Sequence, residues 1–164
     1  MMSIEMDTDD RDAARLVAWG QEMRAVHRRL VDALNIAREA VEDGALPDSL
    51  GTDLQLYCLG FCGALTGHHT GEDAQLFPRV LRERPDLAPA VATLTRDHNM
   101  VNHLIRELAQ AVATQADSVA LLRHLDGIEA VMVTHFRFEE KQLVALLDTM
   151  TLDLDRTALF GAIA

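Results

Sequence analysis

The sequence has little aromatic and cysteine content and no long apolar run. Aromatic residues make up 4% of its 164 residues, and this scarcity, with abundant alanine and leucine, favours helix over sheet. Its two cysteines, Cys58 and Cys62, are too few for a disulfide framework, so nothing indicates an oxidising compartment. We expect buried free thiols rather than a redox pair. No window approaches the roughly 20 apolar residues of a membrane helix, and we expect no membrane partner.

Positive charge is scarce as well. The chain has 15 Lys and Arg against 26 Asp and Glu, a net charge of −11, and its longest basic run is Arg28-Arg29. Because phosphate binding needs clustered Lys and Arg, we expect no nucleic-acid partner. The acidic N-terminus lacks the basic and then apolar order of a signal peptide. These absences predict a cytoplasmic protein.

The sequence does have a high hydrophobic content, 49%, with helical periodicity over most of its length. This content and length predict one domain with a proper core. Gly44, Pro47 and Pro85 interrupt the periodicity. Four long helices are therefore predicted, with Asp48 or Ser49 capping the second and Asp117 or Ser118 the fourth, over residues 12–43, 49–84, 87–115 and 118–148.

Short connections between helices favour antiparallel neighbours. The predicted fold is all-α, an antiparallel up-down-up-down four-helix bundle with a short C-terminal helical tail. We expect a flexible acidic N-terminus over residues 1–12, the bundle over 13–149, and a tail over 150–164 that packs on the bundle or on a partner. Pro78 is predicted to kink or end the second helix. The pattern leaves open whether the protein is a monomer or a homodimer.

One group of residues occurs twice in the chain: His68, Glu72, Asp73, Gln75 and Leu76 recur as His135, Glu139, Glu140, Gln142 and Leu143. Positions i, i+4 and i+7 share one face of a helix, so His, Glu and Gln align on a face twice. Neighbouring apolar residues predict that both faces point inward. Buried imidazole and carboxylate are costly unless something compensates them, and a metal pair compensates both.

The remaining histidines divide into two sets. His27 and His98 lie on apolar stripes of the first and third helices. Either one alone is better explained as a hydrogen-bonded core histidine, but together with the repeated His and Glu residues a metal site is the preferred interpretation. His69, His103 and His124 are expected to be surface or otherwise satisfied polar groups, because a sequence neighbour is turned by about 100° around a helix.

Two His–Glu pairs with bridging glutamates and two further histidines form a mixed nitrogen and oxygen site for two metals. Such donors suit iron, with manganese or zinc as competitors. Gln75 and Gln142 are candidates for hydrogen bonding to a ligand or a bound oxygen species, or are partly exposed residues. Tyr57 shares the His68 face but lies about 16 Å away along a straight helix. It reaches the metals, as ligand or radical relay, only if the glycine-rich stretch bends.

The chain resembles the hemerythrin-like, or HHE cation-binding, family over residues 20–148. The resemblance rests on His27, the run from His68 to Pro78, Asp97-His98, and the run from His135 to Glu140. It implies a four-helix bundle with an oxo- or hydroxo-bridged non-haem di-iron centre. Carried over by position, both glutamates bridge, and the implied ligands are His27, His68, Glu72, His98, His135 and Glu139.

The chain departs from the oxygen-carrying hemerythrins at two positions. Those proteins have a second histidine one turn after the third-helix one, where this chain has Asn102. Their fourth-helix acid is an Asp at i+5, where this chain has Glu140, with Glu139 at i+4. The site is therefore expected to be poorer in imidazole than that of a reversible oxygen carrier. It is expected to have an open position for peroxide, superoxide, nitric oxide or water.

Three functions are compatible with these patterns. The first is a di-iron, catalase-like redox enzyme that disposes of hydrogen peroxide or reacts with other oxygen species. The second is a non-catalytic module that binds or senses oxygen, nitric oxide or iron, with the tail as its switching element. The third is a metal-free interaction bundle.

Overall fold

The computed structural model describes residues 6–43, 50–152 and 156–163, and in these ranges every regular element is a helix. The elements are α1 (Met6–Glu42), α2 (Leu50–Gly71), the π-helix η1 (Glu72–Leu76), α3 (Phe77–Glu83), the 3-10 helix η2 (Pro85–Leu87), α4 (Ala88–Ala113), α5 (Ser118–Leu147) and α6 (Arg156–Phe160). The predicted all-α class is confirmed. Within the described part, no helix combines the length and apolar character needed to cross a membrane.

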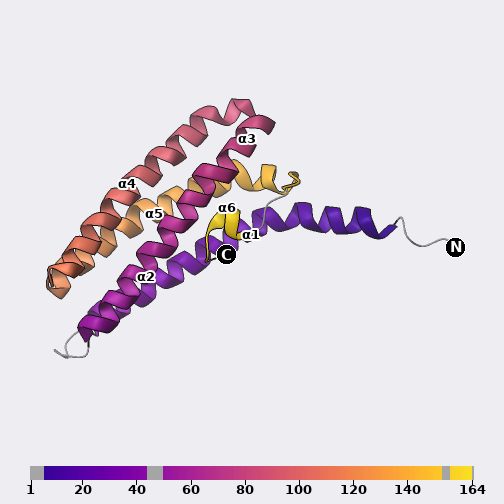
Figure 1. Ribbon diagram of the computed structural model, residues 1–164. Helices are drawn as coiled ribbons and strands as arrows, with labels where there is room; N and C mark the ends of the chain where they lie inside the picture. The colour runs from indigo at the N-terminus through magenta and orange to yellow at the C-terminus, as the bar shows by residue number, and fades with distance from the viewer. Residues whose placement is uncertain (1–5, 44–49, 153–155, 164) are drawn as a thin grey trace.

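The four long helices form a closed ring of contacts: α1 with α2, α2 with α4, α4 with α5, and α5 with α1. Figure 1 shows them lying alongside one another, with the N-terminal part of α1 extending past the other helices. Each long helix therefore has two helical neighbours, as in a bundle. The antiparallel up-down-up-down order stays a prediction, and this ring of contacts agrees with it.

The core is built by the predicted apolar stripes. On α4, the residues with helical spacing are all buried: Val91, Leu94, Val101, Ile105 and Leu108. Each fully buried leucine contributes about 1.5–3 kcal/mol by leaving water. Cys58 and Cys62 are buried free thiols, and burial raises the pKa of both. The core therefore lies along the whole axis of the bundle, and polar groups in it need specific partners.

Asp117, one of the two predicted caps of the fourth long helix, is the residue that caps it. The side chain of Asp117 accepts a hydrogen bond from the Ala120 N–H at 2.8 Å, so Asp117 caps α5. Helix α1 begins at Met6, earlier than predicted. The predicted caps Asp48 and Ser49 lie outside the described residues.

The second predicted helix is divided into α2, η1 and α3, with Pro78 in the first turn of α3. Proline has no backbone N–H, and its ring clashes with the carbonyl four residues earlier, here that of Ala74. Widening to a π-helix over Glu72–Leu76 relieves this conflict without ending the helical run. Pro78 was predicted to kink or end the helix; the helical run does not end there but continues to Glu83, and the irregularity, a π-helix, begins at Glu72.

Candidate metal centre

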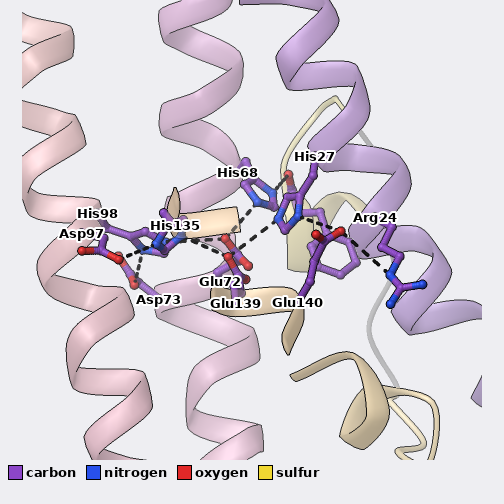
Figure 2. A network of polar contacts seen from close by, with 11 residues as sticks. Arg24, His27, His68, Glu72, Asp73, Asp97, His98, His135, Glu139 and Glu140 are labelled. Carbon is purple, nitrogen blue, oxygen red and sulfur yellow. Dashed lines mark hydrogen bonds and ion pairs between the residues drawn. The ribbon is translucent and has the colours of Figure 1, made fainter. Parts of the chain in front are cut away.

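The six residues predicted as metal ligands come together inside the bundle, and each is at most 4% exposed. His27 lies on α1, His68 on α2, Glu72 on η1, His98 on α4, and His135 and Glu139 on α5. In Figure 2, His98 and His135 lie to one side, Glu72 and Glu139 in the middle, and His27 and His68 to the other side. Each long helix thus supplies at least one imidazole to one interior region.

Both glutamates lie between histidines of different helices. Glu72 Oε1 is 2.9 Å from His68 Nε2 and 3.7 Å from His98 Nε2. Glu139 Oε2 is 3.0 Å from His135 Nε2 and 3.7 Å from His27 Nε2. This placement is what a carboxylate needs to bridge two cations.

The buried donors form two groups that each have the composition of a metal site. One group is His27, His68, Glu72 and Glu139, and the other is His69, Glu72, His98 and His135. Within each group, the candidate ligand atoms lie within 4.8 Å of one another. Glu72 belongs to both groups, so the two candidate sites are adjacent and share a carboxylate.

The expectation that His69 is a surface or otherwise satisfied polar group was wrong, since it is buried and neither ring nitrogen has a hydrogen-bond partner. Its side chain is 1% exposed, and its ring stacks on that of His98 with centroids 3.8 Å apart. The error came from assuming a single inward face, whereas α2 lies between α1 and α4. His68 therefore faces His27 on α1, while His69 faces His98 on α4. His103 is exposed as predicted and pairs with Glu107 at 3.1 Å; His124 is partly buried.

Three imidazoles have their orientation set by a hydrogen bond from Nδ1. His98 Nδ1–H donates to Asp73 Oδ1 at 2.8 Å, and His135 Nδ1–H donates to Asp97 Oδ2 at 3.0 Å. The His68 Nδ1–H donates to the backbone carbonyl of Phe160 at 3.1 Å. The protons are assigned to Nδ1 because carboxylate and carbonyl oxygens only accept. In each ring the Nε2 lone pair is then left to face the interior.

These orienting groups were missed by sequence reasoning. Asp73 and Asp97 each adjoin a predicted ligand in the chain, Glu72 and His98 respectively, which was the available signal. Gln75, a candidate for hydrogen bonding to a ligand, is exposed, and Tyr57, a candidate ligand or radical relay, is 46% exposed, so neither belongs to the buried group. Gln142 and Asn102 are partly buried.

The donor set fits a pair of cations. His98 Nε2 and His135 Nε2 lie 3.0 Å apart, and in neutral rings that donate through Nδ1 both of these atoms present lone pairs. Both carboxylate oxygens of Glu72 and of Glu139, and both ring nitrogens of His69, are buried without a hydrogen-bond partner in the protein. Converging lone pairs and unpaired carboxylates in an apolar interior are what metal ions satisfy.

Electrostatics favour the protonation states that metal binding requires. Burial lowers the pKa of His27 and His69, and burial together with the neighbouring His98 lowers that of His135 to about 4. For Glu72, burial alone would raise the pKa, but positive charge on the surrounding histidines, chiefly His68, lowers it below its usual value, so a cation placed among these rings keeps the carboxylate ionised. Neutral imidazoles and ionised carboxylates are the forms that bind metal.

A pocket of about 300 Å³ opens between α1 and α5 next to His27. Its lining is apolar at Val31, Val133 and Phe136 and charged at Arg24, Arg28, Arg137, Asp32 and Glu140. The Phe136 ring stacks on that of His27 with centroids 3.9 Å apart. Glu140 Oε1 lies 3.6 Å from His27 Nδ1 and 4.0 Å from Arg24 Nε, as Figure 2 shows at the edge of the group. The pocket thus brings solvent to one side of the buried donors.

The chain was compared with models of known protein families. A model described as the hemerythrin HHE cation binding domain matches residues 21–147. This range contains all six predicted ligands and His69. The comparisons with curated proteins and with solved structures found no match.

Proposed function

Because this chain belongs to the hemerythrin HHE cation-binding family, we propose that it holds two iron ions in its interior and reacts there with hydrogen peroxide or another small oxygen species. The observation that carries the proposal is the pair of buried donor groups that share Glu72. A combination of imidazole nitrogen and carboxylate oxygen suits iron, whereas structural zinc sites are built largely from thiolates. The two cysteines are absent from both groups.

We assign the ligands by proximity. His27 and His68 would hold one ion, and His98 and His135 the other, with Glu72 and Glu139 bridging them. The assignment is supported by the short His–Glu distances within each repeat and the 3.7 Å distances between repeats. When bound, two irons supply a reservoir of two electrons, which the conversion of two peroxide molecules into two waters and dioxygen requires.

We also assign His69 to the second ion. Its two ring nitrogens have no hydrogen-bond partner, and it belongs to the donor group with His98 and His135. His69 supplies the additional imidazole that is missing because position 102 is an asparagine. The site then has five imidazoles, so the expectation of an imidazole-poor site no longer favours peroxide chemistry over reversible oxygen binding.

Support for reaction with a small substrate comes from the pocket beside His27. His27 lowers the pKa of the Glu140 carboxyl, and Arg24 lowers it further, although burial opposes this. Glu140 is therefore ionised at neutral pH, and its carboxylate can accept a proton from a peroxide in the pocket. Arg24 and Arg28 keep positive charge beside that carboxylate. The Phe136 ring, stacked on that of His27, gives this side of the pocket an apolar wall.

The metal assignment is tested by elemental analysis and absorption spectroscopy of iron-loaded protein. Wild type should hold two irons per chain and show oxo-to-iron charge-transfer bands. His69→Ala should weaken binding of one ion by more than the roughly 10–100-fold that follows loss of a group hydrogen-bonded to a ligand. His103→Ala is the matched control, because His103 is exposed and outside both donor groups. Equal metal content and identical spectra for His69→Ala and wild type would remove His69 from the ligand set.

The reaction is tested by oxygen release from hydrogen peroxide in a Clark cell, with free iron as the blank. Glu140→Gln should keep both irons but lose about 100-fold in rate, as expected for a general base. Glu107→Gln, an exposed acid on α4, should match wild type. If iron-loaded protein instead binds oxygen or nitric oxide reversibly and leaves peroxide unconsumed, the binding module is the correct function. The five-imidazole donor set is the observation that favours this second candidate.

A further inference from the structure

The C-terminal helix α6 contacts the part of the bundle that carries the donors. It touches α2, η1 and α1, and Figure 1 shows it lying against the bundle close to α1 and α2. Leu159 and Phe160 are fully buried there. The Phe160 ring lies 6.2 Å from that of Trp19 on α1 and 5.9 Å from that of His68 on α2. Arg29 Nη1 also donates to the carbonyl of Ile163 at 3.3 Å.

This contact is made backbone to backbone, and glycines make it possible. A Cβ at Gly71 would lie 2.7 Å from the carbonyl oxygen of Leu159 and 2.9 Å from that of Ala158, closer than real Cβ contacts. Gly161 has a φ of +82°, and a Cβ there would lie 2.6 Å from the carbonyl carbon of Gly67. A side chain at either position would therefore push α6 away from α2.

The close approach brings the Phe160 carbonyl to His68. This oxygen accepts the His68 Nδ1–H at 3.1 Å, and His68 Nε2 then faces Glu72 Oε1 at 2.9 Å. In His27, His98 and His135, the Nδ1 atom instead lies beside a side-chain carboxylate of the bundle. These carboxylates belong to Glu140, Asp73 and Asp97 respectively. His68 alone among these four relies on an acceptor from the C-terminal segment.

We propose that α6 is a positioning element of the metal centre, whose docking holds His68 with its Nε2 lone pair directed at the metal. The inference rests on the proposed metal binding. Loss of the acceptor would leave His68 free to change tautomer or ring orientation, at a cost in metal affinity. By linkage, a metal ion on His68 favours the docked α6 by the same factor. Groups hydrogen-bonded to ligands typically contribute 10–100-fold to affinity.

Gly71→Ala tests the proposal, with Gly63→Ala as its matched control. Both glycines lie on α2, and a Cβ at Gly63 would meet nothing within 4 Å. Anaerobic competition between protein and a chromophoric chelator for Fe²⁺ measures affinity. We expect Gly71→Ala to lose about 10–100-fold for one ion and Gly63→Ala to match wild type. In zinc-loaded protein, ¹⁵N NMR should report Nδ1–H on His68 in wild type and a changed signal in Gly71→Ala.

A second measurement on the unmodified chain keeps the test independent of how the variant folds. Arg156, at the start of α6, is exposed and pairs with Glu22 at 3.5 Å. Trypsin should cut after Arg156 about 10–100-fold more slowly in metal-loaded than in metal-free protein, by the same linkage. Equal cleavage rates in the metal-loaded and metal-free protein would overturn the role of α6. So would a Gly71→Ala variant that keeps the iron affinity and the His68 tautomer of wild type. Wild type that takes up no metal at all overturns the proposed function itself, and this inference with it.

Discussion

Metal-free protein should lose stability as the pH falls from about 6.5 to about 4, because the interior imidazoles resist protonation in the folded state. Burial and the neighbouring His98 lower the pKa of His135 to about 4 from an ordinary 6.5. The groups that face it are His69, Glu72, Asp97, His98 and Glu139. The carboxylates among them raise its pKa, but not enough to reverse the direction.

The sign follows from proton binding. Between these two pKa values the unfolded chain binds a proton at residue 135 and the folded chain does not, so lowering the pH favours unfolding. The stability that neutral His135 contributes is fully present above pH 6.5 and is lost as the pH falls through the folded-state pKa of His135, about 4. At about 1.4 kcal/mol per pH unit, His135 alone lowers the free energy of unfolding by about 2 kcal/mol at pH 5 and by about 3 kcal/mol at pH 4. His27 and His69 act in the same direction.

Urea unfolding followed by circular dichroism measures this loss directly. Chelator-treated protein should be at least about 2 kcal/mol less stable at pH 5 than at pH 7.5, a large part of the 5–15 kcal/mol of a typical domain. Metal-loaded protein should keep its stability to lower pH, since bound cations compete with protons for the same lone pairs. His103→Ala should follow wild type. Equal stability of the metal-free protein at both pH values would refute the reasoning.

Two further predictions concern single side chains. Asp97→Asn should weaken metal binding by about 10–100-fold, because it removes the charged acceptor of His135 Nδ1–H; chelator competition measures this, and unchanged affinity would contradict it. Burial raises the pKa of Cys62 to about 12, so a thiol reagent at neutral pH should label Cys62 much faster after unfolding. Equal labelling of native and unfolded protein would show that the thiol is not protected.

The helices and four of the interior donors are predictable from short-range spacing, whereas His27 and His98 were predicted from their apolar stripes and from the family resemblance. Apolar residues such as Leu94, Val101 and Leu108 recur with the period of a helix and are buried. The His68–Glu72 and His135–Glu139 pairs are four residues apart, so a helix brings each pair together whatever lies around it. Which face of a helix becomes buried, by contrast, depends on how many neighbours that helix acquires.

His69 shows why the rest of the site was not predictable in the same way. Its burial depends on α4 packing against α2, and its partner His98 is far away in the chain. The orienting role of Phe160 likewise requires the C-terminal segment to fold back onto α2. Spacing along one helix contains no information about either contact. The widening at Glu72–Leu76 was only partly foreseeable, since Pro78 predicts a disturbance but not its form.

The energetic cost of this interior argues against the third interpretation, a metal-free interaction bundle. Glu72, Glu139 and His69 have six buried polar atoms without a hydrogen-bond partner in the protein. Two of them, Glu72 Oε1 and Glu139 Oε2, lie within 3.0 Å of a histidine Nε2 that can carry a proton in the metal-free protein. At about 1–3 kcal/mol for each of the other four atoms, the cost is about 4–12 kcal/mol, a large part of the net stability of a domain. Water could donate hydrogen bonds to these lone pairs, but it cannot neutralise two buried carboxylates. Cations do both, so the same side chains that would weaken a metal-free bundle become cross-links between its helices once metal is bound.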